Sequence, residues 1–139
     1  MSPPQNGTYY ITNDALKQAV DLSQGDVSPN TPIIGYTPNE KQDSQKWVVE
    51  KDGENCHIRS ILSTSAHCAT TGGSDGDGVV VGERELFELL EVEAGKYRIK
   101  VPDQNLVWRL ENGNNGTQIN LKPMGLQNTV WHFKLIHTL

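Results

Sequence analysis

The feature that most constrains the fold is a unit of about forty residues that occurs three times along the chain. Each copy opens with a segment of alternating character, at 7–13, 54–60 and 95–101. In each segment an apolar or aromatic residue stands two positions before an isoleucine, and these pairs are Tyr9 and Ile11, Cys56 and Ile58, and Tyr97 and Ile99. A period of two is typical of a strand with one face in the core. The repetition therefore predicts one strand-based unit copied three times.

The copies also close alike, with an aromatic residue followed two positions later by another apolar residue. These closing pairs are Trp47 and Val49, Phe87 and Leu89, and Trp131 and Phe133. Two further strand signals lie inside each unit, at 18–22 and 31–36, at 66–69 and 78–81, and at 106–110 and 117–121. Segments rich in Gly, Asn, Asp, Ser and Pro separate them, as turns require.

Twelve short strands in three equivalent units predict an all-β fold of one particular kind, a β-trefoil with three pseudo-symmetric repeats. The repeats run approximately over 7–52, 53–94 and 95–139, within a single domain that spans 1–139. A barrel closed by threefold repetition removes most of the free strand edges. The length of 139 residues suits one compact domain.

Charge and hydropathy exclude several partners. The net charge is −5, with twelve basic residues and no basic cluster, whereas nucleic acids and anionic membrane surfaces are bound through positive patches. No apolar run approaches the ~20 residues of a membrane span, and the first residues lack the pattern of a signal peptide. The expectation is a cytoplasmic protein, or one exported by an unusual route, that binds no nucleic acid and does not insert into membranes.

No motif of a catalytic, metal or cofactor site is present, so neither an enzyme nor a cofactor is expected. The sequence lacks a nucleophile elbow, a phosphate-binding loop and an HExxH zinc motif. The two cysteines, Cys56 and Cys68, are not in a zinc-binding spacing. A disulfide across a hairpin is conceivable for them, although two buried thiols are the simpler interpretation.

The first unit resembles a repeat of the ricin B-like (R-type) lectins, in particular the small intracellular lectins of mushrooms. The resemblance rests on four motifs in order, which are Gly7-x-Tyr9-x-Ile11, Val20-Asp-Leu-Ser-x-Gly25, Thr31-Pro-Ile-Ile-Gly-Tyr36 and Gln45-x-Trp47. It implies carbohydrate binding without catalysis, through shallow sugar pockets, and glycans of the galactose or GalNAc type as partners. Related lectins are often dimers, so a homodimer is also compatible with the resemblance.

The resemblance places the sugar site mainly in the first repeat. It implies that Asp21 accepts hydrogen bonds from sugar hydroxyls, that Gly25 lets the loop backbone approach, and that Tyr36 stacks on the sugar face. The polar candidates that complete the carbohydrate-binding set are Asn39, Asp43 and Ser44. Gln45 is expected to be structural. This combination suits a pyranose, which has one face of C–H groups and a rim of hydroxyls.

The other two repeats lack the pairing of an acid with an aromatic ring. The alignment puts Cys68 and Glu83 at these positions in the second repeat, and Arg109 and Lys122 in the third. One competent site is therefore expected. The alternative function is a β-trefoil protease inhibitor that acts through exposed loops, for which 23–30 and 111–116 are candidates. The joint presence of Asp21, Tyr36 and Gln45 favours the lectin, since the fold alone does not decide function.

Overall fold

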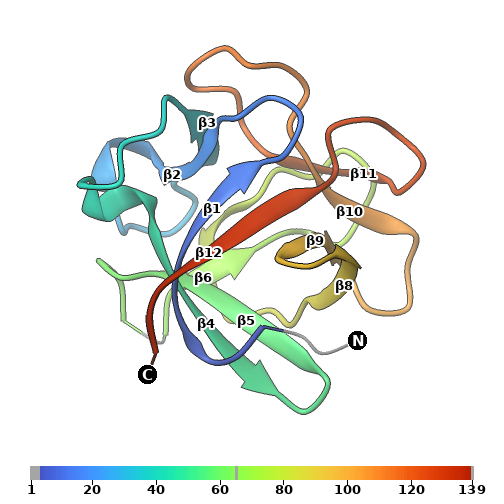
Figure 1. Ribbon diagram of the computed structural model, residues 1–139, viewed down its shortest axis with the longest axis horizontal. Coiled ribbons are helices and arrows are strands. Elements are labelled where there is room, and N and C mark those ends of the chain that lie inside the picture. The colour runs from blue at the N-terminus through green and yellow to red at the C-terminus, as the bar shows by residue number, and fades with distance from the viewer. Residues whose placement is uncertain (1–3, 65, 139) are drawn as a thin grey trace.

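The structure is a computed structural model that describes residues 4–64 and 66–138, and this part of the chain contains twelve strands and two short 3-10 turns (Figure 1). The first four strands are β1 (Gly7–Asn13), β2 (Ala19–Leu22), β3 (Ile33–Tyr36) and β4 (Lys46–Asp52). The next four are β5 (Asn55–Ser60), β6 (Cys68–Thr70), β7 (Val80–Gly82) and β8 (Glu88–Glu93). The last four are β9 (Lys96–Lys100), β10 (Leu106–Arg109), β11 (Asn120–Pro123) and β12 (Trp131–Thr138). The 3-10 turns η1 (Ser23–Gly25) and η2 (Asp43–Gln45) both belong to the first repeat.

Six strands form a closed ring of antiparallel pairs. β1 pairs with β4 and β12, β4 pairs with β5, and β9 pairs with β8 and β12. The last link joins β5 to the residue that precedes β8, through reciprocal backbone hydrogen bonds of 2.9 and 2.7 Å between Cys56 and Phe87. Each repeat therefore gives its first and fourth strand to a barrel.

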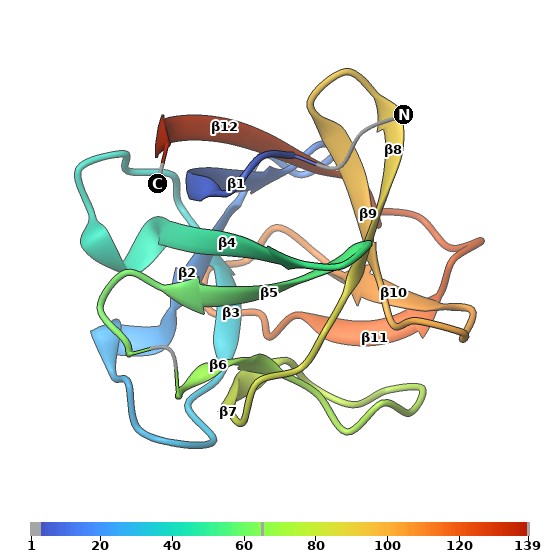
Figure 2. The same ribbon diagram turned by 90° about the horizontal axis from the view of Figure 1, so that it is seen from below.

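The remaining strands form three hairpins, β2–β3, β6–β7 and β10–β11. A cyclic set of backbone hydrogen bonds joins them, from Ile33 N to Val79 O at 3.0 Å, from Val79 N to Ile119 O at 2.8 Å, and from Ile119 N to Ile33 O at 3.0 Å. This triad marks the pseudo-threefold axis and fixes which residues of the three repeats correspond. Figure 2 shows the β6–β7 hairpin on the side of the molecule opposite to β1 and β12. The predicted all-β trefoil with twelve strands is confirmed.

The core is built from the residues that define the repeat. Ile11, Ile58 and Ile99 are completely buried, and so are the anchors Phe87 and Trp131. Trp47 is also buried, and its Nε1 donates to Val20 O at 2.9 Å, while Trp131 Nε1 donates to Trp108 O at 3.1 Å. The same indole-to-backbone bond thus ties the fourth strand to the second in the first and third repeats.

Cys56 and Cys68 are both buried thiols and are not joined by a disulfide. They lie on β5 and β6, two strands that do not pair with each other among the described residues, because β5 pairs with β4 and β6 pairs with β7. Of the two interpretations of the cysteines, the structure therefore supports the buried thiols.

Candidate functional site

A shallow pocket of about 750 Å³ is lined mainly by residues of the first repeat. The elements that carry them, β2, β3 and the segment before β4, lie together on the left of Figure 1. Most of the pocket wall comes from the two 3-10 turns and the ends of β2 and β3. The lining residues are Asp21, Ser23, Gln24, Gly25, Ile34, Tyr36, Lys41, Gln42, Asp43, Ser44, Leu62 and Gly116. Five of the six predicted site residues are in this set, and Asn39 is not.

Asp21 lies on β2, opposite Ile34 of β3, and only 7% of its surface is exposed. A buried carboxylate needs hydrogen-bond donors, and Gln45 supplies one, because its Nε2 donates to Asp21 Oδ2 at 2.9 Å. The second carboxylate oxygen, Oδ1, has no hydrogen-bond donor among the described residues. The carboxylate is thus held in one orientation, with one oxygen still able to accept a hydrogen bond at the pocket.

Gln45 is structural, as predicted. Besides the bond to Asp21, its Nε2 donates to Thr37 O at 3.0 Å, and its Oε1 accepts from Asn39 N at 2.8 Å. One side chain therefore connects β2, the end of β3 and the loop before β4. Asn39 belongs to this loop rather than to the pocket wall, and its Oδ1 accepts from Lys41 N at 3.0 Å.

The loop after β2 brings backbone to the pocket. Gln24 and Gly25 adopt positive φ angles of 55° and 66°, a conformation that glycine tolerates without steric cost. A Cβ at Gly25 would lie 3.7 Å from Leu62 Cδ1, an ordinary contact. Glycine is therefore favoured at this position by the backbone conformation rather than by crowding.

Tyr36 ends β3 and is 43% exposed at the pocket, which leaves ring surface open to a ligand. The third repeat braces the chain beside it, since Gly116 N donates to Gly35 O at 2.9 Å and Asn115 Oδ1 accepts from both Thr37 N and Thr37 Oγ1. Of the other predicted residues, Ser44 is buried, and Asp43 forms an ion pair of 2.9 Å with Lys46.

The pocket also includes residues that the sequence analysis missed. Leu62 comes from the loop between β5 and β6, is 43% exposed, and adds apolar surface. Gly116 comes from the third repeat, and Lys41 and Gln42 come from the loop before η2. No local motif indicates Leu62 or Gly116, because only the packing of the repeats around the axis brings them to the first one.

The triad of Ile33, Val79 and Ile119 corrects the alignment of the second repeat. Counting from these residues along the paired strands, the position of Asp21 is occupied by Thr70 and the position of Tyr36 by Gly82, so the assignment of Cys68 and Glu83 was wrong. The error came from the glycine-rich segment 72–78, which obscures the start of the third strand. Thr70, at the position of Asp21, donates from Oγ1 to Oε1 of Glu85, at the position of Gln45, at 3.1 Å. The second repeat thus keeps a hydrogen bond between these two positions, but the acid is on the fourth-strand side.

In the third repeat the same counting places Arg109 at the position of Asp21 and Lys122 at the position of Tyr36, as predicted. Arg109 Nε donates to Gln127 O at 2.9 Å, and Lys122 Nζ lies 3.4 Å from Asp75 Oδ1. Neither repeat presents a carboxylate opposite an aromatic ring at these positions.

The arrangement in the first repeat suits binding of a neutral polar ligand. Across the described ranges, no three His, Cys, Asp or Glu side chains gather as metal ligands. None of the helices in this part of the chain is long and apolar enough to cross a membrane. A fixed carboxylate, an exposed aromatic ring and nearby backbone are the groups that the rim and the apolar face of a sugar require.

The sequence matches no family model. Among solved structures, the ricin B-like lectin of Macrolepiota procera in complex with lactose has a TM-score of 0.81 and 25% identity, over 97% of this chain and 99% of that one. The Rhizoctonia solani agglutinin has a TM-score of 0.81 and 23% identity, over 97% and 98%. An exo-β-1,3-galactanase from Clostridium thermocellum has a TM-score of 0.82 and 18% identity, but this chain covers only 31% of it. By its structure, therefore, the chain is a β-trefoil that resembles the ricin B-like lectins, and the two lectins above match it over nearly its full length.

Proposed function

We propose that the protein is a lectin that binds a galactose-type sugar in the first-repeat pocket and catalyses no reaction. The observation that carries the proposal is the pairing of Asp21 with Tyr36 in one pocket, with the carboxylate held by Gln45. This pocket lies in a chain that is similar over its length to a lectin in complex with lactose, a galactose-containing disaccharide.

Each group in the pocket has a role that its chemistry supports. Asp21 Oδ1 accepts from sugar hydroxyls, and such charge-assisted hydrogen bonds are the stronger kind. The Tyr36 ring packs against the C–H face of the pyranose with little side-chain entropy to lose. Gly25, Asp43 and Ser44 supply backbone and polar contacts at the rim, and Asn39 acts through the loop that carries them.

Affinity at one such site is expected to be modest. The pocket is shallow and open, and polar groups on its wall must lose contact with water when a ligand binds, so a dissociation constant on the order of micromolar to millimolar follows. Discrimination against epimers comes from the fixed carboxylate, since a misplaced hydroxyl leaves a buried polar group unpaired at a cost of ~1–3 kcal/mol.

A glycan array tests the proposal with three labelled proteins, the unmodified chain, Asp21→Asn and the control Asp103→Asn. Asparagine keeps an oxygen that can accept from Gln45, so the first variant removes the charge and preserves the fold. Asp103 is exposed in the third repeat, at a positive φ that asparagine tolerates. We expect binding to galactose-terminated glycans that disappears in Asp21→Asn and persists in Asp103→Asn.

Two results would count against the proposal. Binding that survives Asp21→Asn would place the sugar site elsewhere in the trefoil. A blank array from folded protein would remove the lectin function and lead to a panel of proteases, which tests inhibition through the exposed loops.

A further inference from the structure

A second hollow, of about 430 Å³, lies where the β1–β2 loop meets β9 and the β11–β12 loop. We call it the Arg98 pocket, and its lining residues are Asp14, Ala15, Arg98, Leu126, Gln127, Asn128, Thr129 and Val130. It shares no lining residue with the first-repeat pocket. The walls of the two pockets are therefore built from different residues.

Arg98 is the cation of this pocket that has no carboxylate partner. Its neighbours on β9, Tyr97 and Ile99, are buried in the core, and Arg98 between them is partly exposed on the other face of the strand. Its Nε donates to Thr129 Oγ1 at 3.3 Å, and no carboxylate of the described residues lies within 4.0 Å of its guanidinium. The two terminal nitrogens thus remain available, and their planar fork matches the two oxygens of a carboxylate.

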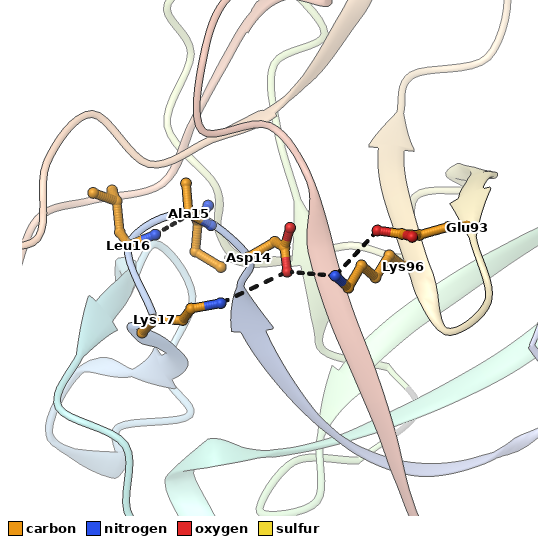
Figure 3. Close-up of polar contacts among 7 residues, drawn as sticks. Asp14, Ala15, Leu16, Lys17, Glu93 and Lys96 are labelled. Carbon is orange, nitrogen blue, oxygen red and sulfur yellow. Dashed lines mark hydrogen bonds and ion pairs between the residues drawn. The ribbon is translucent and has the colours of Figure 1, made fainter.

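The acid in the pocket wall is already compensated. Asp14 Oδ1 lies 3.1 Å from Lys96 Nζ and 3.8 Å from Lys17 Nζ, and Lys96 also lies 3.1 Å from Glu93 (Figure 3). The cations Lys17, Lys96 and Arg98 outnumber the carboxylates of Asp14 and Glu93 by one. The chain as a whole has a net charge of −5, so this region carries a local excess of one positive charge. This local excess favours an anionic ligand over a neutral or cationic one.

The loop that forms the opposite wall is held rigidly by its backbone. Asn128, at a φ of 64°, accepts at its carbonyl from Asn13 Nδ2 at 3.0 Å and from Leu110 N at 3.3 Å, and Val130 O accepts from Asp14 N at 2.9 Å. By contrast, the side-chain amides of Gln127 and Asn128 make no hydrogen bond within the described residues. They can donate to and accept from ligand hydroxyls at a fixed rim.

Leu126 adds the apolar part of the wall, with 44% of its surface exposed. The segment 126–129 also corresponds to 42–45 of the first repeat, most of which lines the first-repeat pocket. Each segment lies just before a tryptophan, Trp131 or Trp47, whose indole N–H donates to the second strand of the same repeat. At the position of Gln45 the third repeat has Thr129, which contacts Arg98 instead of a carboxylate. In the third repeat this segment therefore contacts a cation of the first strand, Arg98, rather than a carboxylate of the second strand, where Arg109 occupies the position of Asp21.

We propose that the Arg98 pocket binds an acidic sugar of the hexuronic acid class. The Arg98 guanidinium holds the sugar carboxylate, the amides of Gln127 and Asn128 contact the hydroxyls, and Leu126 packs against the C–H groups of the ring. Such binding weakens as salt rises, because one exposed ion pair is central to it. It requires no sugar in the first-repeat pocket.

The test is a titration of ¹⁵N-labelled protein with D-galacturonate, followed by the backbone amide signals of residues 126–130. Neutral D-galactose and acetate are titrated in parallel, and the variants are Arg98→Gln and the control Lys51→Gln. Lys51 is an exposed cation of β4 that contributes to neither pocket, so its loss changes the net charge equally. We expect saturable shifts with galacturonate, no shifts of these signals with galactose, a loss of roughly tenfold or more in affinity in Arg98→Gln, and no loss in Lys51→Gln.

Three results would overturn the proposal. These are the absence of a saturable shift with galacturonate, an unchanged affinity in Arg98→Gln, and acetate binding as tight as galacturonate, which would show that the sugar ring is not recognised. If Arg98→Gln does not give a native amide spectrum, Arg98→Lys replaces it, because lysine keeps the positive charge but cannot form the bidentate hydrogen bonds of a guanidinium. A several-fold loss of affinity for galacturonate is then expected. The signals around Asp21 report on the first-repeat pocket separately, so the two proposals fail independently.

Discussion

Gln45 Nε2 lies 2.9 Å from Asp21 Oδ2, and this buried hydrogen bond joins the element that closes the first repeat to the acid in its pocket. The Gln-x-Trp segment thus serves two purposes in three residues. Trp47 anchors the fourth strand in the core, while Gln45 orients the carboxylate and the loop around it. The pocket is consequently coupled to the stability of the repeat that contains it.

The first prediction concerns this coupling. Gln45→Leu leaves the buried Asp21 carboxylate and Asn39 N without their partner, so we expect the free energy of unfolding to fall by about 1–3 kcal/mol or more and lactose binding to be lost. Gln104→Leu, in an exposed loop of the third repeat, is the control. Urea denaturation and lactose titration of both variants provide the comparison. Unchanged stability in Gln45→Leu would show that the hydrogen bond is not important.

The second prediction separates the ring of Tyr36 from its hydroxyl. Because the side chain is 43% exposed, Tyr36→Ala is expected to change the free energy of unfolding by only about 0.5 kcal/mol. Its affinity for lactose should fall by roughly a factor of five or more, since the stacking surface is gone. Tyr36→Phe keeps the ring and should bind nearly as the unmodified protein does. Calorimetric titration measures both, and equal affinities in Tyr36→Ala and Tyr36→Phe would exclude stacking.

The third prediction concerns the thiols. Burial raises the pKa of Cys56 to about 12 and also raises the pKa of Cys68. Because the thiolate is the reactive form, the native protein at pH 8 should react slowly with Ellman's reagent, and both thiols should react at once in denaturant. Fast reaction of two thiols in the native state would contradict the burial seen in the structure.

The fourth prediction concerns acid stability. Burial, together with the positive charge of Arg84, lowers the pKa of His57 below its ordinary value of about 6.5. The unfolded chain therefore takes up this proton at a higher pH than the folded chain does, so stability falls as pH drops below about 6.5. Unfolding free energies of the unmodified protein, His57→Gln and the control His67→Gln, measured from pH 7 to pH 4.5, test this.

His67 is exposed, and His67→Gln serves as the matched histidine-to-glutamine control. The slope of the unfolding free energy against pH should become shallower in His57→Gln alone, whatever the absolute stability of that variant. An identical slope in all three proteins would mean that His57 does not contribute to it.

The sequence predicted the parts of the fold that repeat with strong apolar periodicity. The first strands carry the isoleucine positions and fall where the pattern put them. Trp47 and Trp131 lie in the fourth strands of their units, whereas Phe87 directly precedes β8. The middle strands are short and flanked by glycine-rich turns, so their predicted bounds were displaced by up to three residues, as at β11. Trp108 is completely buried and packs edge-to-face against Phe87 of the second repeat, a contact between repeats that no local pattern indicates.

The candidate site was predictable to the same extent. Asp21, Gly25 and Tyr36 are close in sequence and the hairpin β2–β3 brings them together, so a local motif indicates them. Leu62 and Gly116 reach the pocket from the other repeats, and Arg98 faces a loop thirty residues away, at Thr129. Such contacts depend on how the repeats pack, which the sequence of one unit does not encode.

The most direct test of a single sugar site in the first repeat is a ¹⁵N-resolved titration of the unmodified protein with lactose, with the signals read repeat by repeat. We expect one saturable set of shifts, confined to the segments around Asp21, Tyr36 and 41–44, with a stoichiometry of one per chain. Shifts centred on the second or third repeat, more than one equivalent of bound sugar, or no shifts at all would contradict it.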